Sequence, residues 1–271
     1  MTAHEGTYAF DNALPVQLQR LRALEAVLDE GTIDVLEARG VEAGWHCLEV
    51  GAGGGSVAAW LCERVGGGGV VVATDINTMP LEQLAYANLD VRVHNVLEDE
   101  LPTGQFDLVH CRLLLAWLER PRDAMQRLIA SLKPGGWLVA EEMDFESLSG
   151  GPGLDEHERT LFARLVDVHN AVLIERHAFD PFYGRRVAYD MANANLLDVG
   201  CAGRVSVWKA GQPGGLVWQL TLAQLRQGMI ETGRMTPEEI DTAITLCNDP
   251  RLSLLSPVTM AAWGRQRQQV A

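Results

Sequence analysis

The stretch LEVGAGGGSVAAWL, from Leu48 to Leu61, limits most tightly what this chain can fold into. A short apolar run typical of a buried strand leads into a glycine-rich turn, and the turn leads into a helical pattern. Such a turn brings backbone N–H groups and the start of a helix against a polar or anionic ligand. The sequence therefore predicts a ligand site at this turn.

Short apolar runs then alternate with helical stretches along the chain. The runs are CLEV, VVVAT, VRVHNV, DLVHC and WLVAEE. Strand and helix in alternation predict a parallel sheet with helices on both faces. An amphipathic helix is expected before the sheet, over about 14–39, and a long helix over about 154–177. The run LDVGCAGRVSVWKAG is predicted as one strand, start signals at Thr221 and Thr236 predict further helices, and SPVTMAAWGRQR reads as the last strand.

Composition argues against several classes of protein. Acidic residues outnumber Lys and Arg by 36 to 22, and no basic block is present, so nucleic acid is not an expected partner. The first residues lack the pattern of a signal peptide, and no stretch approaches the roughly 20 apolar residues of a membrane span. We therefore expect a cytoplasmic protein without a membrane span. The five cysteines are scattered and never spaced as Cys-x-x-Cys, so neither a disulfide framework nor a zinc site is expected.

The glycine spacing separates two classes of ligand. The dinucleotide fingerprint G-x-G-x-x-G/A, started at Gly51, would need Gly or Ala where this chain has Ser56. The stretch instead has an acid followed by G-x-G-x-G, namely Glu49, Gly51, Gly53 and Gly55. In this it resembles the class I S-adenosylmethionine-dependent methyltransferases, whose first motif has this form.

The resemblance extends over roughly Trp45 to Glu142. VVVATDIN places Asp75 where the family holds the acid that binds both ribose hydroxyls, and a carboxylate suits two hydroxyl donors. NVLEDELPTGQFDLVHCRLLLAWL and LKPGGWLVAEE match the following strands and turn. The resemblance implies S-adenosylmethionine as cofactor and S-adenosylhomocysteine as product. The residues expected to bind the cofactor are Glu49, Gly51, Gly53, Gly55, Asp75, Ile76, Asn95, Val96, His110 and Tyr8.

Two of these assignments have alternatives. Most relatives carry Asp at the position of Asn95, although an amide also suits the edge of an adenine. The segment with Tyr8 and Phe10 either folds over the cofactor or forms a hydrophobic staple for the first helix.

Candidate catalytic groups follow the strands and the long helix. His110 ends the fourth strand and serves either as a base or as a hydrogen-bonded residue beside the cofactor. His169 lies on an apolar helical line and serves either as a general base or as a packed core residue. Glu141 and Glu142 end the fifth strand, on the acceptor side of the site. Acids there could in principle bind Mg²⁺, as in catechol-type relatives, but no metal site is predicted.

We therefore expect a single α/β domain with a Rossmann-like, seven-stranded, mostly parallel sheet and an antiparallel last strand. The core would span about 40–145, with strands near 197–210 and 256–266, and helical cap segments would span 154–196 and 214–247. The expected activity is methyl transfer to a small, partly apolar molecule, with O-methylation in natural-product biosynthesis as first choice and C- or N-methylation left open. One alternative is a cyclase or eliminase that binds S-adenosylmethionine without methyl transfer, and another is a non-catalytic partner subunit. Oligomeric state is not readable from the sequence.

Overall fold

The chain divides into two compact units. The computed structural model describes residues 10, 15–177 and 179–268. The sheet unit comprises Leu28–Met143, Tyr183–Gly203 and Thr259–Ala271, and the helical unit comprises Met1–Val27, Asp144–Phe182 and Arg204–Val258. The first half of helix α1 (Pro15–Ala38) therefore belongs to the helical unit and the second half to the sheet unit.

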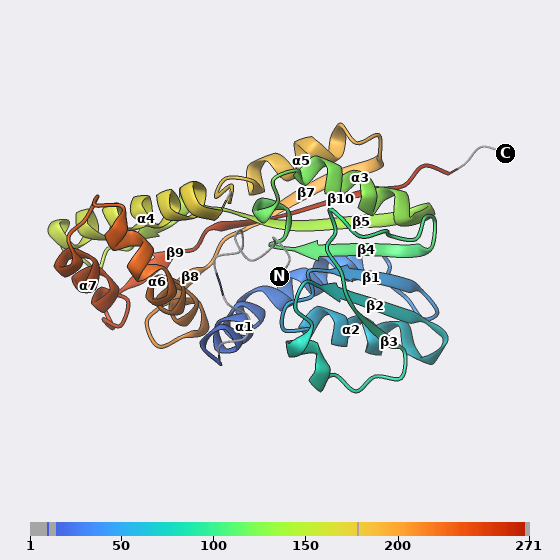
Figure 1. Ribbon diagram of the computed structural model, residues 1–271, viewed down its shortest axis with the longest axis horizontal. Helices are drawn as coiled ribbons and strands as arrows, with labels where there is room; N and C mark the ends of the chain where they lie inside the picture. The colour runs from blue at the N-terminus through green and yellow to red at the C-terminus, as the bar shows by residue number, and fades with distance from the viewer. Residues whose placement is uncertain (1–9, 11–14, 178, 269–271) are drawn as a thin grey trace. The chain divides into compact units, whose positions relative to one another are not determined.

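The sheet unit is built on a seven-stranded sheet, seen with its strands side by side in Figure 1. Its strand order is β3-β2-β1-β4-β5-β10-β7. The strands are β1 (His46–Val50), β2 (Val70–Asp75), β3 (Leu89–Val93), β4 (Phe106–Arg112), β5 (Leu132–Asp144), β7 (Leu197–Arg204) and β10 (Val258–Arg265). The first five pair in parallel, and the exchange of backbone hydrogen bonds between Gln266 and Gly135–Gly136 fits an antiparallel β10. The predicted Rossmann-like sheet is confirmed.

Helices cover this sheet because their apolar stripes need burial. Helix α2 (Ser56–Val65) contacts β1 and β2, and α3 (Pro121–Ser131) contacts β4. In Figure 1, α3 and α5 (Gly184–Ala192) lie on the other side of the sheet from α2. The core on the α2 side includes Val35, Leu36, Val57, Ala58, Leu61, Val71, Ala73, Leu108 and Val139. Short 3₁₀ turns occupy Gly66–Gly68, Met79–Gln83 and Leu115–Trp117.

Besides the first half of α1, the helical unit contains three packed helices and a small sheet. Helices α4 (Glu156–His177), α6 (Pro213–Glu231) and α7 (Pro237–Leu246) contact one another. The small antiparallel sheet has the order β6-β9-β8, with β6 (Ser149–Gly150), β9 (Ser253–Leu255) and β8 (Val207–Lys209), and a 3₁₀ turn spans Phe145–Ser147. The capping box predicted at Thr236 is present, since its side chain accepts from the N–H of Glu239 and the Glu239 carboxylate accepts from the N–H of Thr236. No helix within the described residues is long and apolar enough to cross a membrane.

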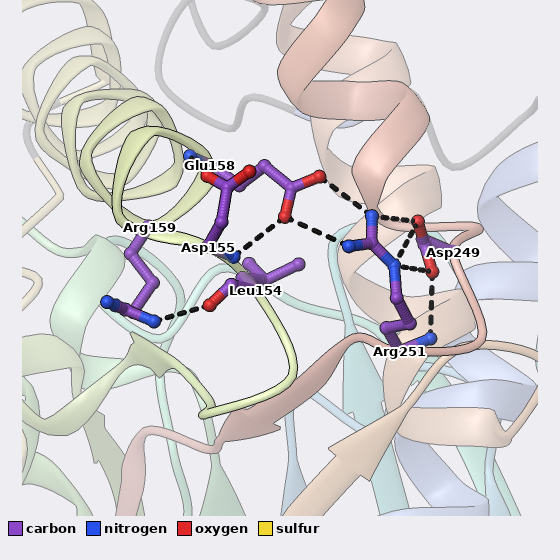
Figure 2. Close-up of polar contacts among 6 residues, drawn as sticks. All are labelled: Leu154, Asp155, Glu158, Arg159, Asp249 and Arg251. Carbon is purple, nitrogen blue, oxygen red and sulfur yellow. Dashed lines mark hydrogen bonds and ion pairs between the residues drawn. The ribbon is translucent and has the colours of Figure 1, made fainter.

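A shared arginine joins two segments of the helical unit, as Figure 2 shows. The Arg251 guanidinium binds Glu158 at the start of α4 and Asp249 after α7, with shortest N–O distances of 2.7 Å to each. The backbone beside it is equally close-packed, because a Cβ on Gly153 would lie 2.2 Å from the carbonyl oxygen of Arg251. The backbone at Gly153, before α4, therefore packs directly against the backbone at Arg251, before β9.

Three sequence predictions differ from the structure in detail. The run predicted as one strand over 197–210 splits, with β7 in the large sheet and β8 in the small one. Thr221 does not start a helix, because α6 begins at Pro213 and the Thr221 hydroxyl donates to the carbonyl of Val217 inside it. Helix α5, which falls within the predicted cap segment 154–196, belongs to the sheet unit.

Candidate functional site

The glycine-rich loop joins β1 to α2 with a backbone that favours glycine. Gly51, Gly53 and Gly55 have φ angles of 69°, 55° and 91°, in the left-handed region where L side chains are strained. The N–H groups of Gly51 and Ala52 donate to the carbonyl of Thr74 at the end of β2, over 2.8 and 3.0 Å. The loop thus turns tightly between two strand ends, and its last residue is the N-cap of α2.

Asp75 lies at the end of β2, directly beside this loop. Its Oδ2 accepts from the N–H of Gly53 at 3.0 Å, and its Oδ1 accepts from the N–H of Asn77 at 3.0 Å. Burial raises the pKa of Asp75, while these N–H groups oppose the rise. A carboxylate offers about four acceptor positions, so lone pairs remain for two further donors. The structure places a fixed acid where the sequence predicts the ribose ligand.

Three further predicted cofactor residues follow β2 and β3. Ile76 comes next after Asp75, and its side chain is 58% exposed although it is apolar. Val96 is buried, and Asn95 accepts the N–H of Leu97 on its side-chain oxygen at 3.0 Å. Within the described residues the amide NH₂ of Asn95 makes no hydrogen bond, so its donors suit the edge of a base.

His110 lies completely buried between two glutamates. Its Nδ1 is 2.6 Å from Glu49 Oε2, and its Nε2 is 3.6 Å from Glu141 Oε2. Burial disfavours the imidazolium, but both carboxylates outweigh it and raise the pKa of His110 to about 9. Burial also tends to raise the pKa of Glu141, yet contacts with His110 lower it overall. At neutral pH, His110 is therefore a buried cation held by two acids.

This charged group continues into α1. The Thr32 hydroxyl donates to Glu141 and accepts from Arg112, whose guanidinium also binds Asp29 at 2.9 Å. The Ser56 hydroxyl at the start of α2 donates to Asp29 at 3.0 Å. The network therefore links the glycine-rich loop to α1. Sequence reasoning missed Thr32 and Asp29, because nothing in an amphipathic helix marks which polar residues face a sheet.

His169 lies in the helical unit, on α4, and is buried. Its ring centroid is 4.7 Å from that of Trp218 and 5.6 Å from that of Phe145. Burial lowers the pKa of His169 to about 4, so the ring is neutral at pH 7. The predicted Tyr8 lies outside the described residues. Nearby Phe10 is buried, with the Arg20 guanidinium 3.9 Å from its ring centroid.

The residues of the sheet unit fit S-adenosylmethionine. Asp75 has spare acceptors for two ribose hydroxyls, Ile76 exposes an apolar surface beside it, and the glycine-rich loop leads to Glu49 and the start of α2. No group of three or more His, Cys, Asp or Glu residues that could hold a metal ion occurs in the part of the chain that the structure describes.

The fold, the loop and the acid at the end of β2 define a class of protein, the class I S-adenosylmethionine-dependent methyltransferases. Residues 48–140 match the model of the family described as "Methyltransferase domain". This match, the fold and the site together support a class I S-adenosylmethionine-dependent methyltransferase with S-adenosylmethionine as its cofactor.

Individual proteins agree with this assignment. The chain is 32% identical to methyltransferase str3 of Strobilurus tenacellus, over 55% of this chain and 52% of that protein. It is 30% identical to the mitochondrial ubiquinone biosynthesis O-methyltransferase of Schizosaccharomyces pombe, over 55% of this chain and 53% of that protein. The chain thus matches only about half the length of each relative. A putative methyltransferase from Bacillus halodurans shares the fold, with a TM-score of 0.57, 14% identity and coverage of 87% of this chain and 98% of that one.

Proposed function

We propose that this chain transfers the methyl group of S-adenosylmethionine to a small, partly apolar molecule, with oxygen as the favoured acceptor atom. The observation that carries the proposal is the Asp75 carboxylate, fixed by Gly53 of the glycine-rich loop within the matched domain. Similarity to the ubiquinone biosynthesis O-methyltransferase and to a fungal methyltransferase supports a small acceptor and favours oxygen. Natural-product biosynthesis in the cytoplasm remains the proposed setting.

The residues divide the work of binding between them. Asp75 would accept both ribose hydroxyls, Ile76 and Val96 would pack against the adenine, and Asn95 would meet its edge. The loop from Gly51 to Gly55 would hold the methionine end. The bound sulfonium supplies a methyl group that is already activated, so the protein mainly aligns the acceptor and keeps water away.

A general base is needed only when the acceptor must lose a proton. His110 is protonated at neutral pH and cannot accept one, so its geometry supports holding Glu49 in place. His169 is neutral at this pH, which is the form that a base requires. His169 therefore remains the proposed base, and its removal should lower kcat more than it raises the cofactor KM.

Calorimetric titration of the full chain with S-adenosylhomocysteine tests the proposal. We expect Asp75→Ala to weaken binding ten-fold or more, a loss of about 1.4 kcal/mol, because a charged acceptor of two hydrogen bonds disappears. Asp90→Ala is the matched control. Asp90 is an exposed acid on the edge strand β3, and among the described residues its carboxylate binds Arg92 and no residue of the candidate site.

The outcomes separate the candidate functions. Absence of binding to the wild-type chain would contradict the methyltransferase and the cyclase alternative together. Binding followed by products that gain the mass of a methyl group supports transfer. Products that form only with the cofactor present and gain no methyl group would favour the cyclase or eliminase.

A further inference from the structure

The turn that follows β4 holds a strained backbone. Leu113 has a φ angle of 55°, in the left-handed region that a bulky residue rarely adopts. Its N–H donates to the carbonyl of Glu141 at 2.8 Å, and the chain continues into the 3₁₀ turn Leu115–Trp117. Such a conformation is strained and persists only where surrounding contacts impose it.

Glu142, at the end of β5, supplies those contacts. Its Oε1 accepts from the N–H groups of Leu114 at 3.0 Å and Leu115 at 2.6 Å. These are the first N–H groups of a 3₁₀ turn, which have no partner within the turn itself. A single carboxyl oxygen thus caps the turn from a neighbouring strand.

The turn also packs against the glycine-rich loop. A Cβ added to Gly51 would lie 3.2 Å from Leu114 Cδ1, so the Leu114 side chain covers this glycine closely. The path from Glu142 to the loop is therefore short, because one hydrogen bond fixes the Leu114 backbone and the Leu114 side chain then touches Gly51.

A carboxyl group is a costly choice at this position. Glu142 is fully buried, its Oε2 has no hydrogen-bond partner among the described residues, and burial raises its pKa to about 8 against the pull of the turn's N–H groups. The groups that face it are Glu141 on its own strand, Cys111 on β4 and Tyr183 before α5. An apolar side chain would fill the space without that cost, but it would leave the N–H groups of Leu114 and Leu115 unpaired.

We propose that Glu142 is a positioning residue that holds the Leu113–Leu115 turn against Gly51 and thereby sets the affinity for the cofactor. The inference rests on the proposed cofactor site. Glu142 does not touch the cofactor in this scheme and acts only through the turn. Its required property is an acceptor oxygen, since the two N–H groups need a partner and not a negative charge.

Two variants of similar size distinguish the effect of the Glu142 acceptor oxygen from the effect of its side-chain volume. Glu142→Gln keeps an oxygen that accepts both N–H groups, whereas Glu142→Met keeps the volume and removes the acceptor. With S-adenosylhomocysteine in calorimetry, we expect Glu142→Gln to bind within about three-fold of wild type and Glu142→Met to bind ten-fold or more weakly.

A third variant measures general destabilisation. Gly153→Ala strains the helical unit, to which no residue of the glycine-rich loop belongs, and should leave the affinity unchanged even where it lowers the melting temperature. Equal affinity of Glu142→Met and wild type would overturn the inference. So would equal weakening by Gln and Met, because that result would mean that the acceptor oxygen is not the property of Glu142 that supports cofactor binding. Failure of the wild-type chain to bind would overturn the proposed function, and the inference with it.

Discussion

At the scale of single residues, the glycines of the cofactor loop differ in what a methyl group would meet. Gly55 has a φ of 91°, and a Cβ there would lie 2.7 Å from Leu84 and 2.8 Å from Leu81. We expect Gly55→Ala to destabilise the protein by about 2 kcal/mol and to weaken S-adenosylhomocysteine binding, since the left-handed backbone strains an L residue and the Leu81 and Leu84 side chains beside the loop must move. Gly40→Ala is the matched control. Gly40 has a φ of 80°, and a Cβ there would have no atom within 4 Å. Gly40→Ala should therefore add a similar backbone strain and leave the affinity for S-adenosylhomocysteine unchanged. If calorimetry gives Gly55→Ala and Gly40→Ala the same affinity for S-adenosylhomocysteine, the prediction is contradicted.

The candidate site shows which residues a sequence can reveal. Glu49, the loop glycines and Asp75 are adjacent along the chain to a strand end, so spacing alone identifies them. Thr32 and Glu142 act through partners in other elements. Their roles depend on the register of β4 against β5 and on how α1 packs, which no local pattern encodes.

At the scale of elements, the segments that lead into α4 and β9 are joined by two kinds of interaction, a surface ion pair and close backbone packing. Arg251 is half-exposed, and surface ion pairs contribute little even when shared. The backbone at Gly153 has no room for a side chain, because a Cβ would meet the Arg251 carbonyl oxygen at 2.2 Å. We therefore expect Gly153→Ala to reduce the free energy of unfolding by about 2 kcal/mol and Arg251→Ala to reduce it much less. Urea unfolding followed by tryptophan fluorescence measures both, and a larger loss for Arg251→Ala would refute this ranking.

Element order was predictable and element ends were not. Apolar runs and helical periodicity correctly predicted the strands and the parallel sheet, because both depend on burial along one face. The run over 197–210 was misread because Val205 and Ser206, which lie between β7 and β8, are neither Gly nor Pro and so do not mark a break, whereas the separation depends on two different sheets. Thr221 was misread because a Thr hydroxyl can donate to a carbonyl inside a helix, here that of Val217, as readily as its oxygen can accept an N–H at an N-cap.

At the scale of the whole molecule, buried titratable groups couple stability to pH. The folded protein keeps the proton of His110 up to about pH 9, whereas the unfolded chain releases it near 6.5. Glu142 acts in the same direction, because its folded pKa of about 8 also lies above the ordinary value of 4.5. The stability from both groups is therefore fully present below their unfolded pKa values and is lost as the pH rises through about 8 and 9.

We expect the free energy of unfolding to fall by about 3 kcal/mol from the His110 proton alone between pH 6.5 and 9.5. Urea unfolding at these two pH values gives the difference. His110→Gln should show a smaller fall over the same interval, because its side chain does not titrate. A fall of the same size in that variant would assign the effect to other groups.

The exposed side chain of Ile76 also has a thermodynamic consequence. Apolar surface that leaves water on binding gives a negative change in heat capacity. An adenine ring packed against Ile76 would cover a side chain that is 58% exposed in the free protein. The enthalpy of cofactor binding would then become more favourable as the temperature rises, while the polar contacts of Asp75 contribute little to that slope.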